Sequence, residues 1–377
     1  MFRSKRTEFS TRGEKRKMTQ LLRLGSLARL LCVVLVLTVI GVSNSGCMVA
    51  TRQPTISQAD LLDERRTQVA RVEQRLRQGT ARVADAAWPI LASNVFLCGN
   101  SVEHRTGLWI AQPTKIVHTM LGIGKETNTT IGEQAKVWAI AHDSPAAAAD
   151  VSIGDVVLRV NGQAVDDSNE ARRLLRRVMK RHGGDAVEIE LARGSDEHIV
   201  RVTPAMTCRS QIRVISESSV NAFANGRTIA IHTGLLQFLP DKRDLQLVIA
   251  HELAHNVGNH VPQARIRAAA GGLLDVAVAK FGRVWSGGLF TQLGAISFSK
   301  RYEREADYLA MYYMANADVD LSNVEEVWRR LSELDVRFIA FGVTHPSAPE
   351  RYVALRKTRE EIEAKRAAGS PLVPERR

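Results

Sequence analysis

Apolar residues recur every four positions between residues 241 and 258, and this spacing predicts a helix with one apolar face. The recurring residues are Leu245, Ile249, Leu253 and Val257. Asp241 is the expected N-cap, and Asp244 adds negative charge to the first turn. Gly258 is expected to end the helix. The same segment contains His251-Glu252-Leu253-Ala254-His255, so the helix sets the relative positions of these side chains.

Before this helix, the pattern of apolar residues divides the chain into four stretches. Residues 51–60 are polar and predict a linker, and residues 60–87 predict a helix with scattered apolar points. Residues 88–98 are apolar and are expected to join a core. From about 118 to 206 the pattern becomes strand-like. It predicts strands at 136–141, 186–192 and 197–203, with a helix at 169–181.

From Cys208 onward, the pattern predicts two strands and further helices. The strands are expected at 211–216 and 228–232, and the second precedes the His251 helix. A strand in that position commonly serves as the sheet edge that receives an extended peptide. Residues 268–289 are rich in Gly and Ala, which fits an amphipathic helix with a glycine turn or a mobile flap. Helices are also predicted from Ser299, as N-cap, to Ala310, and after a Ser347–Glu350 capping box.

The net charge of +12 points to a nucleic-acid partner until the charges are located. Residues 1–29 hold nine Lys and Arg against two Glu, which accounts for +7. Residues 30–47 carry no charge, so the remaining 330 residues hold only +5. Most of the basic character therefore belongs to the N-terminal segment, and no nucleic-acid partner is expected.

The N-terminal segment has the organisation of a signal peptide. A basic region precedes the thirteen-residue apolar run Leu30–Val42, which is short for a membrane span. Ser43-Asn44-Ser45-Gly46-Cys47 resembles a bacterial lipoprotein cleavage site, although Asn44 stands where that pattern expects an aliphatic residue. Lipidation of Cys47, plain cleavage and an uncleaved N-terminal anchor all remain open. Each places the protein in the periplasm or cell envelope, and lipidation or an uncleaved anchor attaches it to the membrane.

Two cysteines, Cys98 and Cys208, lie outside the N-terminal segment. In an oxidising compartment such a pair is a disulfide candidate, and the alternative is two buried free thiols. The pair flanks the strand-rich stretch closely. If the cysteines are bonded, that stretch is an insertion whose ends meet at the bridge.

His251 and His255 lie one helical turn apart, where two imidazoles can bind a single Zn²⁺. Glu252 is offset by about a hundred degrees, so it can take a proton from metal-bound water and need not bind the metal. This short pattern also occurs on ordinary surface helices. A third ligand is needed to decide between a metal site and a surface helix.

The third ligand has two candidate positions. A metzincin would carry a histidine at position 261, but Val261 stands there and the histidine is His260. The stronger candidate is Glu303, because the nearby Ala306 and Ala310 allow its helix to approach the His251 helix closely. Asp307 lies one turn further and can accept a hydrogen bond from a zinc histidine. The alternative for this segment is a solvated charged helix.

The stretch 118–206 resembles a PDZ domain of the bacterial protease-associated kind. The resemblance rests on Ser144-Pro-Ala-Ala-Ala-Ala, on Gly154-Asp-Val-Val-Leu-Arg-Val-Asn-Gly162 and on the helix that follows. Val151-Ser152 stand where the family usually has Gly-Leu, and Leu121–Gly124 is a candidate carboxylate-binding loop. The resemblance implies binding of peptide C-termini or extended segments as an added strand. A structural spacer that binds nothing is the alternative.

A second resemblance covers roughly residues 208–356. It rests on Asn221-Ala-Phe, Thr233-Gly-Leu-Leu, the HELAH segment, the motif from Ser299 to Asp307 and Thr344-His-Pro-Ser347. These motifs in this order resemble the gluzincin family that includes the CAAX prenyl endopeptidase and HtpX, with the closer likeness to soluble envelope members. The resemblance implies one zinc at His251, His255 and Glu303, with Glu252 as catalytic base and Asp307 behind the ligands. It also assigns His345 to the substrate cleft, where it can stabilise the oxyanion.

Together these observations predict an α+β protein with a mainly helical zincin-like peptidase domain, a small sheet and an inserted β-rich PDZ-like domain. The expected parts are a leader (1–47), an N-terminal helical segment of the peptidase (48–98), the PDZ-like domain (118–206), the peptidase (208–358) and a charged tail (359–377). The expected function is zinc-dependent cleavage of unfolded or misfolded envelope proteins. The alternative is a PDZ-bearing chaperone or adaptor with a latched or structural zinc site.

Overall fold

The computed structural model describes residues 54–110, 134–260, 263, 289–334 and 349–375. The chain divides into two compact units, residues 1–61 and 62–377. The described part of the first unit contains the beginning of helix α2 (Gln58–Ala92). The predicted leader, Cys47, the candidate loop 121–124, most of the glycine-rich stretch and His345 lie outside the described residues. The other described helices and strands belong to the second unit.

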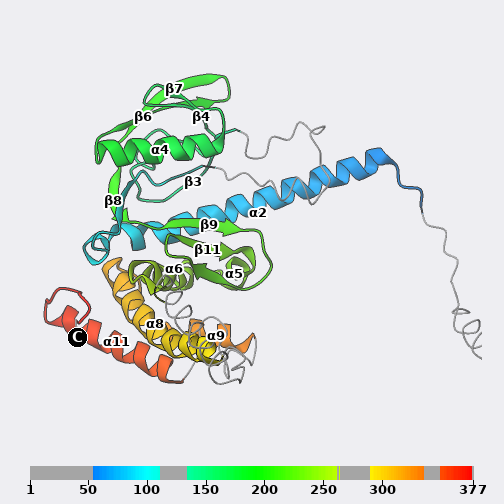
Figure 1. Ribbon diagram of the computed structural model, residues 1–377. Helices are drawn as coiled ribbons and strands as arrows, with labels where there is room; N and C mark the ends of the chain where they lie inside the picture. The colour runs from blue at the N-terminus through cyan, green and yellow to red at the C-terminus, as the bar shows by residue number, and fades with distance from the viewer. Residues whose placement is uncertain (1–53, 111–133, 261–262, 264–288, 335–348, 376–377) are drawn as a thin grey trace, which may run out of the picture. The chain divides into compact units, whose positions relative to one another are not determined.

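A four-stranded antiparallel sheet and one helix form the inserted domain, by which we mean described residues 108–110 and 134–203. The sheet order is β5-β4-β6-β7, with β4 at Val156–Val160, β5 at Gln163–Ala164, β6 at Val187–Arg193 and β7 at Asp196–Val202. Helix α4 (Ser168–His182) packs against β4 (Figure 1). A separate pair, β2 (Leu108–Ile110) and β3 (Val137–Ile140), adds Ile110 and Val137 to the same apolar core. This core therefore begins ahead of the predicted boundary at residue 118.

The inserted domain leaves and rejoins the chain through a two-stranded ribbon. β1 (Val102–Arg105) pairs antiparallel with β8 (Ala205–Cys208), with Val102 opposite Cys208. Cys98, just after the short helix η1 (Val95–Leu97), forms a disulfide with Cys208, and their Cα atoms are 5.7 Å apart. The ends of the insertion thus meet at a covalent bridge, as the spacing of the cysteines suggested.

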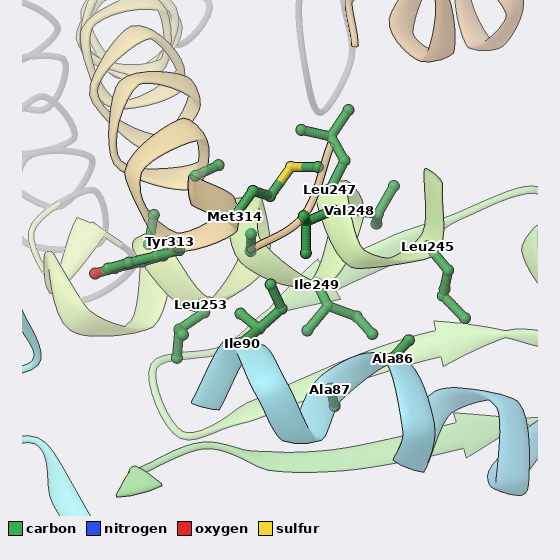
Figure 2. Packing of buried hydrophobic residues seen from close by; sticks show 14 of the residues in the cluster. Ala86, Ala87, Ile90, Leu245, Leu247, Val248, Ile249, Leu253, Tyr313 and Met314 are labelled. Carbon is green, nitrogen blue, oxygen red and sulfur yellow. The ribbon is translucent and has the colours of Figure 1, made fainter. Parts of the chain in front are cut away.

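The second core is mainly helical and surrounds helix α6 (Lys242–Val257). A three-stranded sheet supports it in the order β10-β11-β9, with β9 at Gln211–Ile215, β10 at Ala222–Ala224 and β11 at Thr228–His232. The short α5 (Thr233–Phe238) links β11 to α6, and α8 (Leu289–Asn316), α9 (Glu325–Glu333) and α11 (Pro349–Ala367) complete the domain. Figure 2 shows residues of α6 between Ile90 of α2 and Met314 of α8.

This architecture confirms the predicted fold class, a mixed helical and β domain carrying a β-rich insertion. It corrects the position of the sheet edge, because β11 lies between β10 and β9 and the strand at the edge nearest α6 is β10. It also corrects the cap at Ser299. Helix α8 already begins at Leu289, so Ser299 lies inside it.

The predicted charged tail is folded over most of its length. Helix α11 continues to Ala367, and its buried face carries Leu355, Thr358 and Ile362. After a turn at Gly369, with φ of +63°, Leu372 packs against the helical core. The many charges of this segment hid an apolar face with helical spacing. Among the described residues, no helix has both the length and the apolar character of a membrane span.

Candidate metal centre

Helix α6 is buried on all sides. Every side chain from Asp244 to Asn256 is buried, including the three residues of the predicted site. Asp241 takes the N-cap position with an extended backbone, and Gly258 takes the C-cap position. His251, Glu252 and His255 are only 0%, 2% and 7% exposed. Polar groups buried to this extent need specific partners, so their surroundings decide the chemistry.

Two imidazoles and one carboxylate converge at this helix. Nε2 of His251 lies 3.1 Å from Nε2 of His255. Glu303, from α8, places Oε2 3.2 Å from Nε2 of His251 and Oε1 3.2 Å from Nε2 of His255. Ala306 and Ala310 of α8 are fully buried, and α8 packs directly on α6. The small side chains let the two helices approach, as the sequence predicted.

These three residues fit a bound zinc ion. Among the described residues, they form the one group of His, Cys, Asp or Glu whose ligand atoms all lie within 4.8 Å of one another. Ligands at 2.0–2.2 Å from a tetrahedral zinc lie roughly 3.3–3.6 Å apart, close to the separations found here. Two imidazole nitrogens with one carboxylate are a donor set that suits zinc and leave a fourth position open. His260 does not belong to this group, so the metzincin alternative is not supported.

Asp307 lies behind His251 and is held by an arginine. Its Oδ1 is 3.0 Å from Nδ1 of His251, on the side of the ring away from Glu303. Arg351 of α11 donates two hydrogen bonds to the same carboxylate, at 2.6 and 2.7 Å. Burial acts to raise the pKa of Asp307, but Arg351 and the His251 hydrogen bond outweigh it and keep this pKa below its usual value. Asp307 is therefore an anion that orients His251.

The two cationic partners of the Asp307 carboxylate, His251 and Arg351, both have raised pKa values. Burial acts to lower the pKa of His251, but hydrogen bonds to Asp307 and Glu303 raise it to about 9. Burial likewise acts to lower the pKa of Arg351, and the charge of Asp307 raises it above its ordinary value. The guanidinium also lies over the ring of Trp328, 3.8 Å from its centre, and that ring meets His251 at 5.1 Å.

His260 contacts the second histidine of the pair. Its Nδ1 lies 3.1 Å from Nδ1 of His255, and its ring stacks on Tyr302 with centres 4.5 Å apart. Burial and the neighbouring His255 lower the pKa of His260 to about 4, so its ring is neutral near pH 7. The sequence raised His260 only as a metal ligand, and it did not identify a role for Arg351 or Trp328. For Arg351 a signal was present, since it falls on the apolar face of α11 with Leu355.

Comparisons with known proteins match this organisation. Residues 199–359 match peptidase family M48, and residues 119–203 match the PDZ domain family. The mitochondrial metalloendopeptidase OMA1 of Schizosaccharomyces pombe is 27% identical over 182 residues, which is 45% of this chain and 52% of that protein. OMA1 of Arabidopsis thaliana is 29% identical over 147 residues, covering 37% of this chain and 30% of that protein.

A bacterial relative has a similar level of identity. The putative beta-barrel assembly-enhancing protease of Vibrio cholerae is 27% identical over 165 residues, covering 38% of this chain and 33% of that protein. The chain thus spans between about a third and a half of the length of these relatives. A solved structure, the crystal structure of the HtrA3 PDZ domain bound to a phage-derived ligand, also matches. The match covers 28% of this chain and 88% of the HtrA3 chain. The two chains are 18% identical in this match, with a TM-score of 0.21.

Proposed function

We propose, from the premise that residues 199–359 form a peptidase domain of family M48 and residues 119–203 a PDZ domain, that this protein is a zinc-dependent endopeptidase of the cell envelope. The observation that carries the proposal is the convergence of His251, His255 and Glu303 next to Glu252. A purely structural zinc site would not require a carboxylate at position 252.

The chemistry follows from the positions of the side chains. Zinc held by the two histidines and Glu303 would polarise the scissile carbonyl and lower the pKa of a water molecule. Glu252 takes the proton from the attacking water and passes it to the leaving amine. Asp307 keeps the His251 ring oriented, with its charge balanced by Arg351. For His345, which lies outside the described residues, we retain the oxyanion-stabilising role that the family resemblance implies.

Substrate would be bound at two places, strand β10 and the PDZ domain. Strand β10 is at the edge of its sheet and contacts α6, so an extended peptide added to β10 would pass near the site. The PDZ domain would bind exposed C-termini or extended segments of unfolded envelope proteins. This arrangement suits protein quality control. It is the basis on which we propose that role.

The envelope location rests on the leader. Its basic region, apolar run and Cys47 support export followed by lipid attachment, with a cleaved signal or an uncleaved anchor as alternatives. Mass spectrometry of the mature N-terminus tests this proposal. A diacylglyceryl group on Cys47 supports lipidation, and an unmodified N-terminus elsewhere contradicts it.

The activity is tested by incubating the purified full-length protein with unfolded casein. Cleavage should be lost with a zinc chelator and in Glu252→Gln, while Glu252→Gln should still bind one zinc per chain. Glu303→Ala should lower bound zinc well below one per chain. If casein is cleaved equally by wild type and Glu252→Gln, the enzymatic proposal is wrong. If wild type binds zinc and casein but never cleaves, the adaptor alternative is favoured.

A further inference from the structure

The two histidines of the metal centre use their second ring nitrogens differently. The Nε2 atoms of both face Glu303, so their Nδ1 atoms point away from the centre. Nδ1 of His251 faces the carboxylate of Asp307. Nδ1 of His255 instead faces another imidazole, that of His260, at 3.1 Å. The contact between His255 and His260 therefore involves neither the three metal ligands alone nor Asp307.

The protons of this histidine pair follow from the geometry. A neutral imidazole that offers Nε2 to a metal carries its proton on Nδ1. His255 is then the donor, and His260 must accept through an unprotonated Nδ1. The proton of His260 consequently sits on Nε2, which faces Oε2 of Glu305 at 3.7 Å. This separation is too long for a hydrogen bond, and Nε2 of His260 has no hydrogen-bond partner among the described residues, but the negative charge of Glu305 favours a proton on that nitrogen.

We propose that His260 is a positioning residue that accepts the hydrogen bond of His255 Nδ1 and so fixes the tautomer and the ring plane of this metal ligand. The proposal rests on the metal site of the proposed function and extends it by one residue. Partners of this kind typically account for about 10–100-fold in metal affinity.

The local backbone is arranged to bring His260 back to the helix. After the C-cap Gly258, Asn259 has a φ of +53°, and this left-handed residue turns the chain. A Cβ atom on residue 258 would lie 2.4 Å from Nε2 of His260. Glycine at this position therefore leaves the space that the imidazole fills. The His260 side chain is only 3% exposed.

Helix α8 holds the other face of the ring. Tyr302, adjacent to the ligand Glu303, stacks on His260 at an interplanar angle of 15°. Its hydroxyl donates a hydrogen bond of 2.9 Å to Oε1 of Gln263. The same helix thus supplies one metal ligand and the surface that orients the partner of another.

Two substitutions separate the hydrogen bond from the packing. His260→Phe keeps an aromatic ring against Tyr302 but has no acceptor. His260→Asn loses the stacking but places an amide oxygen near the position of Nδ1. Gly258→Ala keeps the histidine at position 260, but the added Cβ atom displaces its ring. Zinc affinity of the full-length protein, measured by competition with a chromophoric chelator, reports on each variant without relying on activity.

We expect His260→Phe and Gly258→Ala to bind zinc about 10–100-fold more weakly, and His260→Asn to stay within about threefold of wild type. ¹⁵N NMR of the zinc-loaded protein should show the proton on Nδ1 of His255 and on Nε2 of His260. Circular dichroism checks that each variant is folded. If a variant is unfolded, the NMR tautomers of the wild type decide the question.

Three results would overturn the proposal. These are wild-type affinity in His260→Phe, equal losses in the Phe and Asn variants, or a proton on Nδ1 of His260. Glu303→Ala separates this failure from failure of the metal site. If it loses zinc while His260→Phe does not, the site stands and only the role of His260 is wrong. If Glu303→Ala keeps its zinc, the proposed site falls, and the His260 proposal falls with it.

Discussion

At the metal centre, three side chains converge on one point, and Asp307 and Arg351 hold the ring of His251 in place. His251, Glu252 and His255 follow from spacing on one helix, and Glu303 with Asp307 follows from a second helix with small neighbours. Arg351 was missed although it falls on the same face of α11 as Leu355, because a lone arginine on a charged helix is ordinarily solvated. The sequence raised His260 only as a metal ligand. Its actual contact depends on the positive φ of Asn259, which no local pattern specifies.

The Arg351–Asp307 pair leads to a prediction about stability. Arg351→Met leaves a buried carboxylate without its guanidinium and should lower the free energy of unfolding by about 3–5 kcal/mol. Arg351→Met combined with Asp307→Asn should lose less than the sum of the single variants, because neither then leaves a buried charge alone. Urea denaturation of the zinc-free proteins measures these values.

The control for this cycle is Arg356→Met, on an exposed position of the same helix. Its effect should stay within about 0.5 kcal/mol. Additive effects of the two substitutions at positions 307 and 351 would mean that the ion pair does not stabilise the fold.

At the scale of elements, the boundaries of α6 were predicted better than its environment. The spacing of Leu245 and Ile249 indicated one apolar face, whereas α6 is buried all round. Asp244, expected to add negative charge to the first turn, is 1% exposed and pairs with Arg243 and Arg330. Periodicity reports the contrast between the faces of a helix. It cannot show that ion pairs from other elements will cover the polar face.

The contact between α6 and α8 depends on small side chains and yields the second prediction. Ala306→Leu should force the helices apart, lower the free energy of unfolding by about 1–3 kcal/mol and weaken zinc binding at least tenfold, because Glu303 moves with α8. Chelator competition and urea denaturation measure the two effects. Arg304→Leu, on the exposed face of the same helix, should change neither. Unchanged zinc affinity in Ala306→Leu would show that close packing here does not position the ligand.

At the scale of the whole molecule, the sequence identified the insertion through two cysteines and a change of pattern. It did not identify the ribbon of β1 and β8, because a pairing between residues about a hundred positions apart has no local signature. Among the described residues, the helical core and the core of the inserted domain are distinct clusters, and a smaller third cluster joins Trp88 of α2 to Ala139 of β3. Val157 and Leu191 belong to the inserted domain, whereas Cys98 and Cys208 belong to the helical core with Leu253. The disulfide is therefore part of the helical core.

This placement predicts which domain the bridge stabilises. The disulfide joins residues separated by 110 positions, and chain entropy assigns such a loop about 4–5 kcal/mol. In Cys98→Ala/Cys208→Ala, segment-resolved amide hydrogen exchange should be faster in α6 and β11 of the helical core. Exchange in β6 and β7 should be unchanged, because their core contains neither cysteine. Reductant should reproduce the effect in wild type and do nothing further to the double variant. Faster exchange confined to β6 and β7 would instead mean that the bridge serves to hold the insertion together.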